Sequence, residues 1–229
     1  MDTTSILIGL VVAAAVVYFA YTYFKTGSPG GGPQDLIGSA IDGRKEFKSN
    51  VSLPESFNQQ QGIVFSYTAW IRVDDYSYRY GQPKVVFTKG PEDLSSMCPG
   101  IMFDANTNTM LVKIDTFGTQ EVITVSNLPA KKWFHFALVV DQDSVDVYIN
   151  GTLYTHQTLA QLPRQNPSTV IVGPQGGFDG KIANLRYYNY YLGPSDITAS
   201  MGSPPSPSPT DTQDITPPYQ DITWWIGRK

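Results

Sequence analysis

The chain has 229 residues and a formal net charge of −4, from 16 Lys and Arg against 20 Asp and Glu. Nucleic acid is not an expected partner, because phosphate binding requires a basic face. Cys98 is the only cysteine, so no disulfide can form within the chain, which is typical of a reducing compartment.

Residues 6–24 form an uncharged, mostly apolar segment near the start of the chain. A helix of this length would be about 28 Å long, close to the hydrocarbon thickness of a bilayer. The sequence therefore predicts a transmembrane anchor in residues 1–25. A cleaved secretory signal is the alternative, but no Lys or Arg precedes the segment. The residues expected at the membrane interface are Tyr18, Tyr21, Tyr23 and Lys25.

The orientation of this anchor rests on few charges. Asp2 precedes the apolar segment, whereas Lys25 and, farther on, Arg44 follow it. The positive-inside rule then places the large domain on the cytosolic side of a single-pass membrane protein.

Residues 26–49 are expected to be a Gly/Pro-rich linker. A short amphipathic helix over residues 35–47 is possible within it, because Asp35 can cap a helix and apolar side chains follow at helical spacing. An ordered linker without a helix is the alternative. The apolar side chains of this helix are Leu36, Ile37, Ala40 and Ile41.

From residue 62 onward the hydrophobic pattern changes to a period of two, in short runs rich in β-branched and aromatic residues. The sequence Asn150-Gly151 between two such runs predicts a hairpin with a type I′ turn. The pattern indicates an all-β sandwich over residues 50–200. The expected strands are 63–73, 84–89, 109–114, 121–126, 133–141, 144–150 and 169–172.

The C-terminal part of the chain divides into two segments. Residues 201–218 are too rich in proline for a sheet or helix and are expected to be an extended linker. Residues 219–229 are expected to be an aromatic docking tail, because tryptophans at a terminus favour burial on another surface. Folding back onto the sandwich or insertion into the bilayer interface are the alternatives. The contact residues of the tail are Trp224, Trp225 and Ile226.

Tyr76, Tyr78 and Tyr80 alternate along the chain around Arg79. In an extended segment this spacing places three rings on one side, where they can contact a protein partner or stack on a glycan. The alternative is that the rings cover an edge of their own sandwich.

Asp104, Asn106 and Asn108 have the spacing of oxygen ligands at the start of a calcium loop. Thr109 stands where such a loop requires glycine, so these residues are weak metal candidates and a turn between two strands is favoured. His135 is expected to be a hydrogen-bonded histidine on one face of a central strand rather than a catalytic base. No nucleophile motif surrounds His156, and a catalytic triad is not expected.

Six motifs occur in a characteristic order. They lie at residues 65–71, 85–90, 132–141, 147–151, 178–189 and 192–197. Together they resemble the concanavalin A-like lectin/glucanase superfamily, in its laminin G-like and pentraxin-like branch. The resemblance implies a two-sheet antiparallel jelly roll, and Asn184 departs from it where such domains often carry an acidic residue.

Glycosidases of this superfamily carry a Glu-x-Asp-x-x-Glu array that supplies the acid and the nucleophile. None of the glutamates of this chain stands in such an array, so neither enzymatic activity nor a cofactor is expected. The first functional hypothesis is a membrane-anchored structural protein that bridges a bilayer to a protein assembly, such as a minor capsid protein of a large DNA virus with an internal membrane. The second is a membrane-anchored lectin that binds a glycan.

Overall fold

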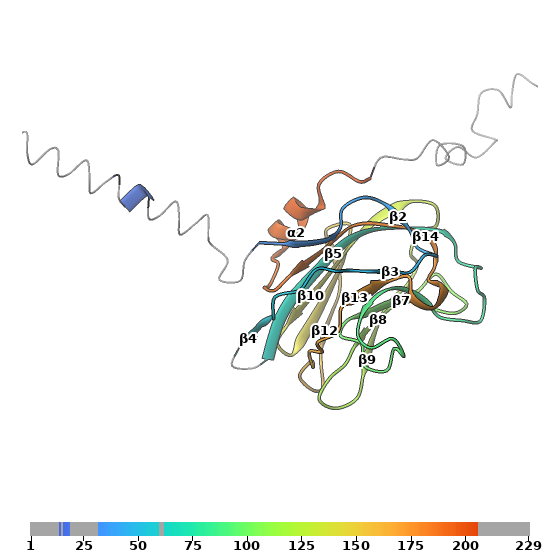
Figure 1. Ribbon diagram of the computed structural model, residues 1–229, viewed down its shortest axis with the longest axis horizontal. Coiled ribbons are helices and arrows are strands. Elements are labelled where there is room, and N and C mark those ends of the chain that lie inside the picture. The colour runs from blue at the N-terminus through green and yellow to red at the C-terminus, as the bar shows by residue number, and fades with distance from the viewer. Residues whose placement is uncertain (1–13, 15, 19–31, 60–61, 206–229) are drawn as a thin grey trace, which may run out of the picture.

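The computed structural model describes residues 14, 16–18, 32–59 and 62–205 (Figure 1). Residues 14 and 16–18 are helical, and the rest of the predicted span 6–24 lies outside the described residues. Within the part of the chain that the structure describes, no helix has the length and apolar character needed to cross a membrane.

The described chain folds into two antiparallel sheets, here called sheet A and sheet B. The order in sheet A is β1-β14-β5-β10-β11-β12, with β2 also paired to β14 and β4 to β5. Its strands are β1 (Gln34–Ile37), β2 (Ile41–Asp42), β4 (Phe57–Gln59), β5 (Gly62–Asp75), β10 (Trp133–Asp141), β11 (Ser144–Ile149), β12 (Thr152–Thr158) and β14 (Asp179–Tyr188).

Sheet B has the order β3-β13-β6-β7-β8-β9 and packs on sheet A to form a sandwich (Figure 1). Its strands are β3 (Phe47–Lys48), β6 (Lys84–Lys89), β7 (Gly100–Phe103), β8 (Met110–Ile114), β9 (Glu121–Val125) and β13 (Val170–Val172). Two short helices follow β13 and β14, namely the 3₁₀ helix η1 (Pro174–Gly176) and α2 (Pro194–Met201). The predicted all-β, two-sheet antiparallel class is confirmed.

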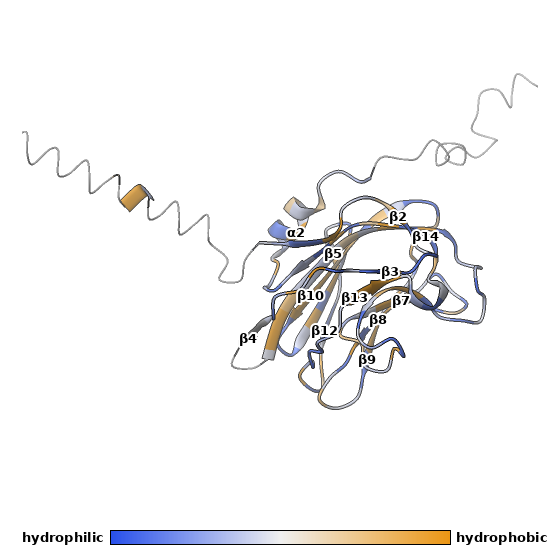
Figure 2. Ribbon diagram, viewed as in Figure 1, coloured by the Kyte–Doolittle hydropathy of each residue, from blue (hydrophilic) through white to orange (hydrophobic). Residues whose placement is uncertain are grey.

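Alternation of side chains between the two faces of each strand builds the core. Phe134, Phe136 and Leu138 of β10 point between the sheets into the large apolar cluster, and all three are fully buried. Phe87 of sheet B meets Phe136 with ring centroids 6.4 Å apart and edge to face. Burial of each such ring contributes about 2–3 kcal/mol, so this layer holds the two sheets together. In Figure 2 the hydrophobic colouring is concentrated in the strands.

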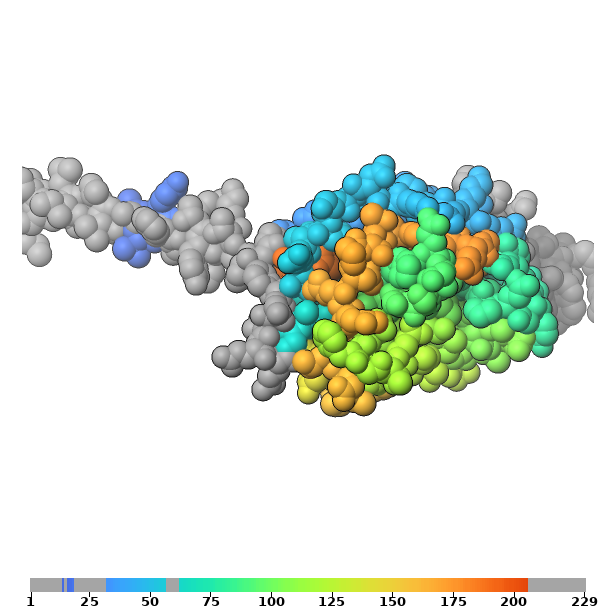
Figure 3. All heavy atoms as spheres, turned by 60° about the horizontal axis from the view of Figure 1, so that its bottom comes forward, coloured from blue at the N-terminus to red at the C-terminus, as the bar shows by residue number. Residues whose placement is uncertain are grey.

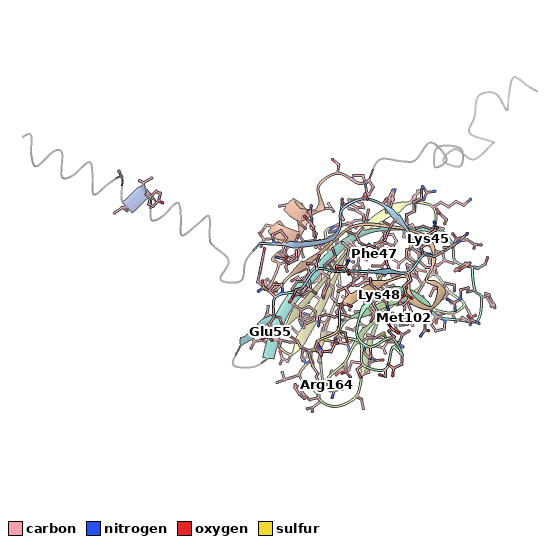
Figure 4. All side chains as sticks on the ribbon, viewed as in Figure 1. Lys45, Phe47, Lys48, Glu55, Met102 and Arg164 are labelled. Atoms are coloured by element: carbon pink, nitrogen blue, oxygen red, sulfur yellow. The ribbon has the colours of Figure 1, made fainter. Side chains whose placement is uncertain are left out.

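The outer faces of both sheets are also partly covered. Ile197 of α2 packs with Ala137 and Val139 of β10 on the outer face of sheet A. On the outer face of sheet B, Met97 of the loop after β6 packs with Met102 of β7, which is labelled in Figure 4. The sandwich therefore has two small apolar clusters outside its main core.

The predicted hairpin at Asn150-Gly151 is confirmed. Both residues have positive φ, 51° and 76°, as a type I′ turn requires, and Ile149 pairs with Thr152 across it. The register shifts once between β11 and β12, at a bulge between Val147 and Tyr148. Asn184 also has a positive φ of 50°, within the irregular part of β14 where the register to β5 shifts, and asparagine tolerates this conformation well.

The predicted helix over residues 35–47 is wrong. This segment contributes β1, β2 and β3, which pair with β14 and β13. β2 and β3 have two residues each, too few to show a period of two, and long-range pairing decides their conformation. The sandwich therefore begins at Gln34 rather than at residue 50, and the folded part extends to Met201 at the end of α2.

Candidate binding site at the loop end of the sandwich

The sandwich has two opposite ends, and the C-terminus of β5 marks the one that we call the loop end, on the right in Figure 1. The segment after β5 turns immediately. The Asp75 carboxylate accepts hydrogen bonds from the backbone N–H and the hydroxyl of Ser77, both at 2.7 Å. These bonds lower the pKa of Asp75 and hold a turn in place of a strand.

The three tyrosines therefore do not line one side of an extended segment, and that prediction was wrong. The Tyr76 ring packs edge to face on Phe103 of the core, with centroids 5.5 Å apart, and its hydroxyl donates to the Pro129 carbonyl. Tyr78 is half-buried and donates to the Gly176 carbonyl at 3.0 Å. Tyr80 alone points into solvent, with 71% of its surface exposed.

Two arginines fix the surface around these rings. The Arg44 guanidinium lies 5.2 Å from the centroid of the Tyr78 ring and pairs with Asp179 at 2.7 Å. The hydrogen bond to Asp179 is the main cause of a raised Arg44 pKa. Arg79 donates to the Gln175 carbonyl and, at 2.7 Å and 3.2 Å, to the side-chain oxygen of Gln82. We call Arg44, Tyr78, Arg79 and Tyr80 the Tyr78 cluster.

The structure brings the predicted calcium-type loop beside this cluster, a proximity that the sequence did not predict. The Gly81 N–H donates to the Ala105 carbonyl and to the Asn106 side chain, each at 3.2 Å. The buried Lys84 ammonium donates to the carbonyls of Asp104 and Ala105 at 3.0 Å and 2.8 Å. The two loops therefore form one surface.

The polar side chains of this second loop are engaged in the turn itself. The Asp104 carboxylate accepts from the backbone N–H groups of Asn106 and Thr107 and from the Thr107 hydroxyl, at 3.0–3.1 Å. Asn108 donates to the Leu128 carbonyl. Among the described residues no group of three or more His, Cys, Asp or Glu is placed to hold a metal ion. Local hydrogen bonding of this kind is typical of a structural turn.

The two histidines lie apart from the loop end's rings. His135 is buried on one face of the central strand β10, as predicted, but that face is the outer one of sheet A, where it is 2% exposed and lies edge to face with Trp70 at 5.4 Å. Its Nδ1 has no hydrogen-bond partner among the described residues, and burial lowers its pKa to about 4. His156 pairs across β11 and β12 with Asp146 at 2.5 Å.

Of the predicted membrane-interface and tail residues, the structure describes Tyr18 alone. Tyr18 is helical and exposed. The remaining membrane-interface and tail residues lie outside the described part of the chain and stay predictions, namely Tyr21, Tyr23, Lys25, Trp224, Trp225 and Ile226.

Sequence reasoning missed Arg44 and the 174–177 segment. Arg44 lies in the segment that the sequence predicts to be a linker, because β2 and β3 are too short to show a pattern. In the second segment, the succession of Gly176 and Gly177 was the available signal, since both have positive φ.

The two-sheet antiparallel sandwich defines a lectin-type jelly roll. Residues 44–198 match the model of a laminin G-type family described as the concanavalin A-like lectin/glucanases superfamily. The chain belongs to this superfamily. No curated protein sequence matches it.

Solved structures support the same fold. The binding domain of botulinum neurotoxin serotype D superimposes with a TM-score of 0.54 and 13% identity, over 73% of this chain and 40% of that one. The receptor binding domain of the C/D mosaic serotype gives 0.54 and 11%, over 75% of this chain and 45% of that one. The chain thus spans less than half of the length of either structure.

Proposed function

We propose that this protein is a non-enzymatic, membrane-anchored interaction protein that bridges a bilayer to a protein assembly. The observation that carries the proposal is the Tyr78 cluster, in which Tyr80 is exposed and Tyr78 and Arg79 are fixed by hydrogen bonds to η1. Tyrosine and arginine are the residues that dominate binding energy at protein interfaces. Fixing them before binding reduces the entropy lost on association.

The segments on either side of the sandwich support the same proposal. Residues 6–24 have the composition of a membrane anchor. Residues 219–229 carry the Trp224-Trp225 pair and follow the Pro-rich linker of residues 201–218. A protein attached to the bilayer at one end, with two aromatic contact surfaces beyond it, is suited to link a membrane to a protein layer. The layer that we propose is the capsid of a virus with an internal membrane, in which this chain would be a minor capsid protein.

The test uses the full chain reconstituted in membranes with the native assembly. Tyr80→Ala and deletion of residues 219–229 should each reduce incorporation into the assembly while membrane association is retained. Tyr191→Ala is the matched control, because Tyr191 is 42% exposed and lies outside the loop end. Incorporation that is unchanged in both variants would contradict the proposal.

A glycan-binding role is the second candidate. The observation that favours it is that exposed Tyr80 lies two residues after Tyr78 and that the next residue, Gly81, bonds to Asn106 of the Asp104 turn. Together these loops offer a ring face and polar groups to a sugar. Binding on a glycan array that is lost in Tyr80→Ala and Tyr78→Ala, but kept in Tyr191→Ala, would favour the lectin over the assembly protein. Turnover of a β-glucan would contradict both.

A further inference from the structure

The end of the sandwich opposite to the loop end contains a cavity of about 510 Å³. Its walls are the strap of residues 50–56, which crosses from sheet B to sheet A, and residues 165–169 before β13. Figure 3 shows these two segments beside one another on the face turned forward, and Figure 4 marks Glu55 on the strap. The floor is formed by side chains of β5, β6 and β14.

The strap is fastened to both sheets. The Ser49 N–H donates to the Val170 carbonyl of sheet B at 2.9 Å. From sheet A, the Tyr187 hydroxyl donates to the Pro54 carbonyl at 3.0 Å and the Asn189 side chain donates to the Glu55 carbonyl at 3.4 Å. The wall of the cavity is therefore a fixed part of the fold.

The floor includes a tyrosine whose hydroxyl no described group satisfies. Tyr67 is 1% exposed, and its hydroxyl has no hydrogen-bond partner among the described residues. Burial raises the pKa of Tyr67, with contributions from Tyr187 and Cys98, which line the same cavity. The hydroxyl of Ser56 in the strap is also buried without a partner in this part of the chain. Buried hydroxyls without a hydrogen-bond partner are rare in protein interiors, because leaving them unpaired destabilises the folded state.

A cation stands at the same cavity. The Lys89 ammonium, at the end of β6, is partly buried and contacts the backbone carbonyl and, at 3.5 Å, the side-chain oxygen of Asn166. No carboxylate pairs with it among the described residues, and burial lowers its pKa. Asp115, whose charge acts on the neighbouring Cys98, is instead paired with Arg164 at 2.8 Å.

We propose that this cavity binds a small organic carboxylate with an apolar body. The carboxylate would accept hydrogen bonds from Lys89 and from the Tyr67 hydroxyl, which supply the charge and the donor that such a group requires. The body would lie against Phe65, Leu53 and Val51, the apolar part of the lining. The volume is within the range of about 300–1,000 Å³ that small-molecule sites occupy. The proposal does not depend on the function of the loop end.

The test measures binding of benzoate, 4-phenylbutanoate and octanoate to the full chain in nanodiscs by saturation-transfer NMR and by the rise in Tm. The corresponding uncharged amides and empty nanodiscs are the ligand controls. We expect a carboxylate to bind and raise Tm, because a ligand that binds only the folded state stabilises it. The amide should bind at least about tenfold more weakly.

Three variants locate the site. Lys89→Met and Tyr67→Phe should each weaken binding about tenfold or more, because each removes a bond to a charged group. Tyr67→Phe should not lower the Tm of the protein without added ligand, since it removes a buried hydroxyl that has no described partner. Tyr76→Phe is the matched control, because its hydroxyl is bonded to Pro129 far from the cavity, and it should keep full binding.

Specific outcomes would overturn the proposal. They are binding of no carboxylate in the set, equal affinity for the amides, or unchanged affinity in Tyr67→Phe and Lys89→Met. A Tyr67→Phe protein that is strongly destabilised without ligand would show that the hydroxyl has a structural role instead. None of these results bears on assembly through the Tyr78 cluster.

Discussion

The two ends of the sandwich treat their polar side chains in opposite ways. At the loop end, Tyr78 and Arg79 are both bonded to η1, and Arg44 is bonded to Asp179. At the cavity end, Tyr67 and Ser56 are buried with hydroxyls that no described group satisfies. The loop end thus uses its polar groups to fix an outer surface, whereas the cavity end buries hydroxyls that have no partner among the described residues.

The largest expected loss of stability comes from a substitution at the loop end, where the backbone requires a glycine. Gly177 has a φ of +52°, and a Cβ placed on it would lie 1.9 Å from the Gly43 carbonyl oxygen. Gly177→Ala should therefore lower the free energy of unfolding by about 3 kcal/mol or more, measured by urea denaturation. Gly81→Ala is the control, because Gly81 has a similar φ of +81° but open space around it, and it should cost only about 1 kcal/mol. Equal costs would show that the close approach to Gly43 is unimportant.

The next effect concerns His135, a buried polar group beside Trp70, whose pKa is lowered to about 4 by burial. The unfolded chain then binds more protons than the folded one between about pH 6.5 and pH 4, so stability falls as the pH is lowered through this window. The loss should reach about 3 kcal/mol at pH 4. Urea denaturation at pH 7 and pH 4 measures it.

His135→Gln should flatten this part of the pH profile. A profile that stays steep in His135→Gln would place the sensitivity elsewhere.

A smaller effect is expected at the Tyr78 hydroxyl, which donates to the Gly176 carbonyl. Tyr78→Phe removes one partly buried hydrogen bond and should cost about 1 kcal/mol. The readout is the Tm of the full chain, and Tyr80→Phe, at an exposed ring, serves as the comparison with no expected change. A neutral Tyr78→Phe would mean that η1 is not held by this bond.

The smallest expected effect sharpens the contrast at the cavity end. Tyr67→Phe deletes a hydroxyl that has no described partner, so the free energy of unfolding should not fall despite complete burial of the ring. Tyr187→Phe, which removes the bond to Pro54, should cost about 1 kcal/mol in the same assay. A reversed order would remove the distinction drawn between the two ends.

The sequence was informative where a local pattern is long enough to decide the structure. The nine residues of β10 and the Asn150-Gly151 turn were predicted at their observed positions. The tyrosine spacing was misleading, because hydrogen bonds between Asp75 and Ser77 impose a turn on it. Local competition of this type is not visible in the alternation of rings alone.

The cavity was beyond reach of sequence reasoning for a different reason. Its floor combines Tyr67 of β5, Lys89 of β6 and Tyr187 of β14, which become neighbours only when the two sheets pack and the strap closes over them. None of these residues belongs to a short motif. Arg44 was missed in a similar way, since only pairing of β2 with β14 brings it to Asp179.

The attachment of α2 has a mechanical consequence. β1 is the first element of the folded domain along the chain and α2 is the last. Both are fixed to sheet A, since β1 pairs with β14 and the Trp70 indole donates a hydrogen bond to the Met201 carbonyl at the end of α2. Tension applied through residues 32 and 205 would pass through β1, β14, β5 and α2. Sheet B lies outside this load path, so such tension would strain sheet A first and leave most of sheet B unloaded.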